Sequence, residues 1–181
     1  MGVDLNYDYM RDLVRSLMSL ESVPIDKMVT LLQKGKTEGR TAYICGNGGS
    51  AANASHLALH LNQAGLKAIC LSDNVPMITA LANDIDYDQV FSAQVRWADM
   101  TKTLLVVVSG SGNSLNILRV IDAWCGEIIG LLGMDGGQTL KRLQDRQGST
   151  YIVVPSMAYG PIEDAHSALI HILAERLKMV T

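Results

Sequence analysis

The sequence lacks the features that identify several common classes of protein. Its 181 residues carry a net charge of −3 without a basic stripe, so binding of nucleic acid through charge has little support. The longest apolar run, 104–108, is far too short to cross a bilayer, and the acidic start holds no signal peptide. We therefore expect a cytoplasmic protein with no membrane partner and no direct contact with nucleic acid.

Cysteine is scarce and unpaired in the sequence. The three cysteines are Cys45, Cys70 and Cys125, and none forms a CxxC pair. Cys45 and Cys70 lie inside apolar runs, where thiols are typically buried and reduced. This pattern favours a cytosolic protein without a disulfide framework.

Short apolar runs rich in Val and Ile alternate with helical patterns. The runs cover residues 42–45, 67–71, 103–108, 128–132 and 151–154. The helical patterns cover residues 50–63, 75–82, 88–100, 114–124, 138–147 and 161–180. Two amphipathic helices, 5–20 and 25–38, precede them. Repeated strand–helix alternation predicts an α/β fold, a three-layer αβα sandwich with a five-stranded parallel sheet in flavodoxin-like order. We expect residues 1–181 to form a single domain that opens with the helical pair 1–38.

Two glycine-rich loops follow predicted strands, at the sheet edge where ligands bind in such folds. Gly46–Ser50 reads GNGGS, and Ser109–Ser114 reads SGSGNS. Glycines allow close backbone approach to a ligand, helix N-termini attract anions, and the serines add hydroxyl donors. Either loop alone is also explained as a tight turn. Two together at one edge favour phosphate binding.

The same loops exclude two nucleotide-binding motifs. Neither loop fits GxxxxGK[ST], which argues against a nucleoside triphosphate, and neither fits GxGxxG, which argues against a dinucleotide. We therefore expect no nucleotide cofactor.

All four histidines fall in two predicted helices. His56 and His60 are four residues apart and share one helix face. Glu163 and His171 lie eight apart on the last helix, about 80° around its axis and about 12 Å along it. A set of His56, His60, Glu163 and His171 would suit zinc, although an HxxxH pair is more often on a surface or in a core. We assign His166 a structural or interface role.

The sequence also resembles a known family. The motifs that carry the resemblance, in chain order, are CGNGGSAANASH, SDN, ALANDIDYDQVFSAQV, SGSGNS, GMDGG and the ending with IED and IHIL. Together they resemble the sugar isomerase (SIS) domain, and within it the phosphoheptose isomerases, which interconvert sedoheptulose 7-phosphate and D-glycero-D-manno-heptose 7-phosphate. The resemblance covers nearly the whole chain. It implies a homotetramer with the N-terminal helices between subunits and active sites at the subunit interfaces.

The resemblance also implies roles for particular residues. The positions that match substrate contacts are Asn47, Gly48, Gly49, Ser50, Asn83, Asp84, Ser109, Gly110, Ser111, Ser114 and Glu163. The positions that match the zinc ligands of the family are His56, His60, Glu163 and His171. The matching substrate is a small sugar phosphate.

The chain departs from the family pattern at two of these positions. His60 stands where the family has Glu, and Glu163 stands where it has Gln. One interpretation is that the carboxylate has moved across the site and the ligand set has stayed complete. The segment after His60 is also short and lacks the family's arginine, which bears on the choice of sugar.

These departures leave the catalytic roles open. We expect Glu163 or His60 to act as the base of an enediol isomerisation and His171 to act as acid or ligand. A related ketose phosphate is an alternative substrate. A rival interpretation is a non-catalytic SIS scaffold or regulator that binds a replication initiator protein or senses a sugar phosphate. Such a scaffold would not need the set of histidines and glutamate.

Overall fold

In the computed structural model, which describes residues 5–179, the chain forms a five-stranded sheet in which every pair of neighbouring strands is parallel. The strands are β1 (Thr41–Gly46), β2 (Ala68–Cys70), β3 (Thr103–Ser109), β4 (Ile128–Gly133) and β5 (Thr150–Val154). Their order in the sheet is β2-β1-β3-β4-β5. This order confirms the predicted flavodoxin-like topology, and all five predicted strands are present.

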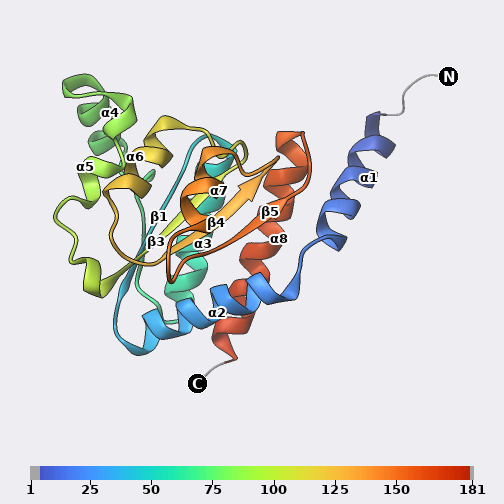
Figure 1. The fold of residues 1–181 in the computed structure, drawn as a ribbon, viewed down its shortest axis with the longest axis horizontal. Helices are drawn as coiled ribbons and strands as arrows, with labels where there is room; N and C mark the ends of the chain where they lie inside the picture. The colour runs from blue at the N-terminus through green and yellow to red at the C-terminus, as the bar shows by residue number, and fades with distance from the viewer. Residues whose placement is uncertain (1–4, 180–181) are drawn as a thin grey trace.

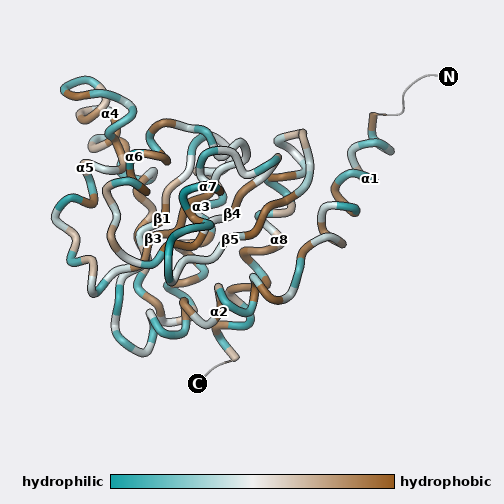
Figure 2. The backbone as a smooth tube through the Cα atoms, in the orientation of Figure 1, coloured by the Kyte–Doolittle hydropathy of each residue, from teal (hydrophilic) through white to brown (hydrophobic). Residues whose placement is uncertain are grey.

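Helices cover both faces of the sheet (Figure 1). They are α1 (Leu5–Met18), α2 (Ser22–Thr37), α3 (Gly49–Gln63), α4 (Val75–Asp84), α5 (Ser92–Val95), α6 (Leu115–Ala123), α7 (Gly137–Gln144) and α8 (Tyr159–Lys178), with the short 3₁₀ turns η1 (Tyr87–Gln89) and η2 (Met100–Lys102). Figure 2 shows hydrophobic stretches along the strands and along the helices that face them. The predicted three-layer sandwich is confirmed.

The central strand β3 explains why the sheet needs cover on both sides. All seven of its residues, TLLVVVS, are buried. A parallel strand that is buried on both faces reads as a continuous apolar run rather than an alternating one. Leu104, Val106 and Val108 face a core shared with α2, α3 and α8, while Leu105 and Val107 face a second core shared with α5, α6 and α7.

The predicted helix 88–100 is wrong. The chain there forms η1, the four-residue α5 and then η2. Val90 and Phe91 are both fully buried although they are adjacent in sequence, and neighbouring side chains on a helix point about 100° apart. Asp86 and Asp99 also bond to backbone N–H groups two residues ahead, which stabilises separate short turns.

Helix α1 lies at one edge of the molecule, packed beside α8 (Figure 1). Its inner side packs Leu13 and Leu17 onto a small cluster formed by Val154, Ile162 and Ala165. Its outer side leaves large apolar side chains exposed, namely Met10, Val14 and Met18. No helix within residues 5–179 is long and apolar enough to span a membrane.

His166 is the buried histidine of α8, and it ties this helix to the sheet. The side chain has no exposed surface, and its Nε2 lies 3.0 Å from the carbonyl oxygen of Leu132 in β4. Burial lowers the pKa of His166 to about 4, although the bond to Leu132 opposes the shift. The structural role that the sequence predicted is confirmed.

We expect this histidine to make the fold sensitive to acid. The folded-state pKa lies below the unfolded value of about 6.5, so the unfolded chain binds a proton first and stability falls as the pH drops from about 6.5 to about 4. Over that range the loss due to His166 should approach about 3 kcal/mol. Urea unfolding of the wild type and of His166→Gln at pH 7.5 and pH 4 measures it. Equal pH-dependent losses in the two proteins would contradict this expectation.

Candidate active site

A cavity of about 230 Å³ opens at the carboxyl edge of the sheet, between the two glycine-rich loops and the start of α8. Its lining residues are Asn47, Gly48, Gly49, Ser50, Val108, Ser109, Gly110, Ser111, Ser114, Tyr159 and Glu163. The structure therefore brings together both loops that the sequence predicted, with Glu163 beside them. Asn83 and Asp84 are not among the lining residues. They lie exposed at the end of α4, where the Asn83 amide donates to Asp84.

Two glycines of the loop after β1 have different roles, one in its backbone conformation and one in the space it leaves for a neighbouring side chain. Gly48 has a φ of 56°, a conformation that L side chains rarely adopt, and α3 begins at the next residue. Gly49 faces the carboxyl group of Glu163 so closely that a Cβ at this position would overlap it. The sequence therefore allows a carboxylate from α8 to lie against the first turn of α3.

The loop after β3 is held from within and from the neighbouring loop. The Ser109 hydroxyl accepts from the Gly112 N–H at 3.1 Å, and the Ser111 hydroxyl accepts from the Asn113 N–H at 3.3 Å. The Asn113 side chain accepts from the Gln138 N–H, which ties the loop to the start of α7. Ser114 is the N-cap of α6 but its side chain makes no capping bond, so its hydroxyl can serve a ligand in the cavity.

A pair of amides joins the first loop to the start of α6, which follows the second loop. Asn47 donates to Asn116 at 2.8 Å, and Asn116 donates back to Asn47 at 2.9 Å. The Tyr87 hydroxyl also donates to Asn47 at 3.1 Å. Asn116 is buried, so breaking this pair would leave an amide unsatisfied. Sequence reasoning missed Asn116, Tyr87 and the lining residue Tyr159. The position of Asn116, two residues after the serine loop, was the only available signal.

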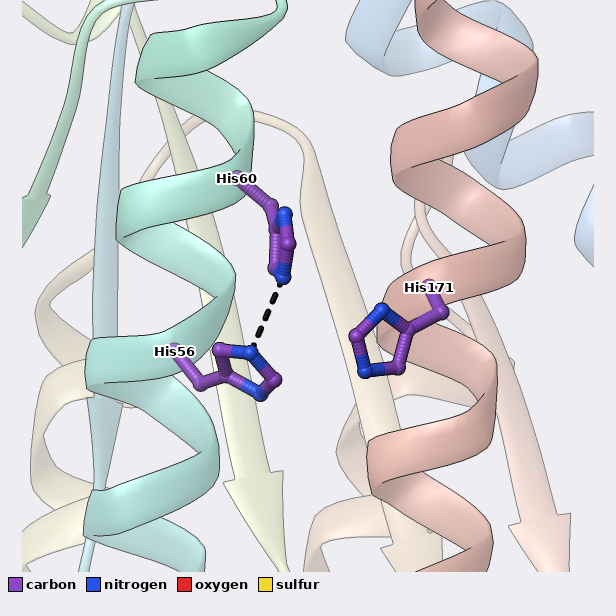
Figure 3. A group of neighbouring side chains, drawn as sticks. All are labelled: His56, His60 and His171. Atoms are coloured by element: carbon purple, nitrogen blue, oxygen red, sulfur yellow. Dashed lines mark hydrogen bonds between the residues drawn. The ribbon is translucent and has the colours of Figure 1, made fainter.

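The three candidate histidines of α3 and α8 meet between these helices (Figure 3). His56 and His60 project from α3 and His171 projects from α8, with one nitrogen of each within 4.8 Å of the others. The Nε2 atoms of His56 and His60 lie 2.9 Å apart. Burial lowers the pKa of His60, and the neighbouring His56 and His171 lower it further. A low pKa favours the neutral imidazole, which is the form that binds metal.

This arrangement fits a single divalent ion. With bonds of about 2.0–2.1 Å to zinc, two ligand nitrogens on a tetrahedral ion lie roughly 3.3 Å apart. One nitrogen pair in this cluster is 2.9 Å apart and all three ligand atoms lie within 4.8 Å of one another, so small side-chain movements reach that spacing. Within residues 5–179, Glu163 is not part of the group whose ligand atoms lie within 4.8 Å of one another. It lies about two helical turns before His171 on α8, at the cavity.

Comparisons with known proteins agree on one family. The model of the SIS domain matches residues 6–124. A phosphoheptose isomerase of Helicobacter pylori strain P12 is 35% identical over 172 residues, which cover 90% of this chain and 86% of the relative. The structure of a phosphoheptose isomerase from Neisseria gonorrhoeae superimposes with a TM-score of 0.88 at 30% identity, covering 96% of this chain and 95% of the other. One from Francisella tularensis gives the same TM-score at 24% identity, covering 98% and 100%, which supports the fold.

Two glycines of the first loop should respond differently to alanine. A Cβ at Gly46 would overlap the backbone carbonyl of Ser50, so the backbone must shift, and we expect Gly46→Ala to lose about 1–3 kcal/mol of stability. A Cβ at Gly49 meets only the flexible end of Glu163, and alanine suits a helix better than glycine, so Gly49→Ala should be nearly neutral. Urea unfolding measures both. Equal losses in the two variants would contradict the described loop.

Proposed function

The chain belongs to the SIS domain family, and from this premise we propose that it is a sugar-phosphate isomerase. The specific reaction is the conversion of sedoheptulose 7-phosphate to D-glycero-D-manno-heptose 7-phosphate, as the names of the relatives suggest. One observation carries the proposal. A carboxylate and a cluster of three histidines lie along the same two helices that border a serine-lined cavity.

The serine loop is the proposed phosphate site. Ser109, Ser111 and Ser114 place hydroxyl groups around one side of the cavity, and Ser50 does so from the first turn of α3. Helix α3 has 15 residues, and its N-terminal amides add a favourable field for an anion. Asn83 and Asp84 stay in the proposal as contacts of the sugar. Both residues lie outside the cavity of their own chain, which agrees with a site at a subunit interface, where they would contact the sugar bound by a neighbouring subunit.

Glu163 is the proposed base, and its position is the support for that choice. Its carboxylate lies in the cavity, whereas the Nε2 of His60 faces His56 in the cluster. In the reaction the base removes a proton from C1 of the ketose, the C2 carbonyl becomes the hydroxyl of an enediol, and the proton returns to C2 as C1 becomes the aldehyde. His171 remains the proposed acid or ligand.

His56, His60 and His171 are the proposed zinc ligands, with Glu163 as a fourth candidate. A zinc ion bound there would polarise the sugar carbonyl and stabilise the negative charge that develops on its oxygen. A set of three neutral imidazoles leaves the full charge of the ion for this purpose. It also leaves the carboxylate of Glu163 available for proton transfer.

A panel of ketose phosphates is incubated with the wild type in heavy water, and exchange of the carbon-bound proton is measured by NMR. We expect exchange with sedoheptulose 7-phosphate. Glu163→Gln should lower kcat by about 10²–10⁴-fold, since it removes the base. A faster reaction with a shorter ketose phosphate would replace sedoheptulose 7-phosphate as the proposed substrate. Near-normal turnover in both Glu163→Ala and His60→Ala would overturn the catalytic assignment.

Zinc analysis of the purified protein tests the histidine cluster separately. We expect about one zinc per chain in the wild type and in Glu163→Gln, and a strong loss in His60→Ala and His171→Ala, because three nitrogens form the site. His166→Gln is the matched control, since this histidine bonds to Leu132 instead. A wild type with neither zinc nor isomerase activity would favour the scaffold or sensor alternative.

We also propose that residues 1–181 form a single domain. Four copies would assemble into a homotetramer with the N-terminal helices between subunits. The outer side of α1 supports it, since Val14 is 53% and Met18 is 84% exposed. Apolar side chains exposed to this degree on one helix are typical of an interface. Light scattering of the wild type and of a Val14→Glu/Met18→Glu variant measures the assembly. Identical masses would remove α1 from the interface.

A further inference from the structure

Helix α1 contacts the segment 155–164, which joins β5 to α8 and includes the first turns of α8; we call this segment the β5–α8 connection. Tyr159 and Glu163, both within it, line the cavity. Two residues of α1, Tyr9 and Asp12, make the polar contacts to it. Neither residue lines the cavity, so any effect on it must pass through the connection.

Tyr9 holds the first turn of α8 in two ways. Its hydroxyl donates to Asp164 Oδ2 at 2.6 Å, a short bond to a charged acceptor. Its ring lies over Gly160, where a Cβ would come within 2.8 Å of a ring carbon. The pKa of Tyr9 is raised to about 12 by the bond to Asp164 first, then by burial and by the charges of Asp164 and Glu163. The tyrosine therefore remains a donor at any ordinary pH.

Asp12 acts on the residue that precedes α8. Its Oδ2 accepts from the Ser156 hydroxyl at 2.6 Å, and the oxygen of that hydroxyl accepts from the Ala158 N–H at 3.1 Å. Ser156 is 1% exposed, and Ala158 is the N-cap of α8. Ala158 has no side-chain hydroxyl of its own, and its N–H bonds to Ser156, so Ser156 links Asp12 to the start of α8.

The contacts of Tyr9 and Asp12 bracket the cavity residues along the chain. Ala158 and Gly160 flank Tyr159, and Asp164 adjoins Glu163. We propose that Tyr9 and Asp12 are positioning residues, which fix Tyr159 and Glu163 at the cavity through the β5–α8 connection. The catalytic consequence rests on the proposed function, whereas the mechanical effect on the connection does not.

Apolar packing alone does not fix this geometry. The inner side of α1 meets a cluster of three buried residues, Val154, Ile162 and Ala165, which is small beside the two main cores. Such a cluster holds the helix but gives little directional control, because apolar contacts are not directional. Hydrogen bonds with defined donors and acceptors supply that direction.

Steady-state kinetics of Tyr9→Phe and Asp12→Leu tests the catalytic part. Both substitutions remove the hydrogen bond and keep the approximate size of the side chain, so we expect thermal midpoints and zinc content close to the wild type. We expect kcat to fall about tenfold with KM within about twofold, since a small misplacement of a base slows the chemical step more than binding. Asp8→Leu makes the same change as Asp12→Leu on the same helix, at a residue that pairs with Arg11, and should match the wild type.

A cycle with Asp164→Ala shows whether Tyr9 acts through its partner. The double variant Tyr9→Phe/Asp164→Ala should have the same kcat as Asp164→Ala alone, because alanine offers no acceptor and the bond is already lost. Additive losses would contradict action through this bond. A kcat of Tyr9→Phe equal to that of the wild type would overturn the catalytic part.

Hydrogen–deuterium exchange tests the mechanical part without relying on activity. Amides of residues 156–163 should exchange faster in Tyr9→Phe and Asp12→Leu than in the wild type and Asp8→Leu, while those of α3 should not change. If the wild type turns over no ketose phosphate, the proposed function fails, and this exchange result still decides whether α1 fixes the connection. Unchanged exchange at 156–163 would overturn the positioning role.

Discussion

The packing of α3 against α8 is the contact on which the candidate site depends. Both helices lie on the same face of the sheet and share one core, to which Ala54, Leu57 and Leu61 of α3 and Leu169 and Leu173 of α8 contribute. The Asn53 side chain also donates to the carbonyl oxygen of Glu163 at 2.9 Å. This contact brings Glu163 to Gly49 near the first turns and the three histidines together farther along. One packing interface therefore builds both the cavity wall and the nitrogen cluster.

Much of the architecture could be predicted because it depends on patterns that the chain carries locally. The five apolar runs locate the strands, and the glycine and serine loops at their ends locate the cavity. The spacing of His56 and His60 places them on one face of α3, and the connectivity brings His171 beside them. These conclusions need only helix periodicity and the parallel arrangement of the sheet.

The remainder depends on side-chain direction and on contacts between distant segments. The place of Glu163 at Gly49 follows from its rotamer and from the space that this glycine leaves, neither of which spacing reveals. The Asn47–Asn116 pair joins residues 69 positions apart, and the place of Asn116 just after the serine loop does not reveal its partner. The segment 88–100 reads as a helix because its apolar residues are dense, but its side chains are buried in more than one direction.

Helix α1 faces two ways, with Tyr9 and Asp12 on the β5–α8 connection and Met10, Val14 and Met18 exposed. If a neighbouring copy covers the exposed side, one element serves both assembly and catalysis. Separation of the copies would then loosen the wall that carries Glu163. Turnover per chain would fall on dilution, and the protein's own abundance would set its efficiency without any added effector.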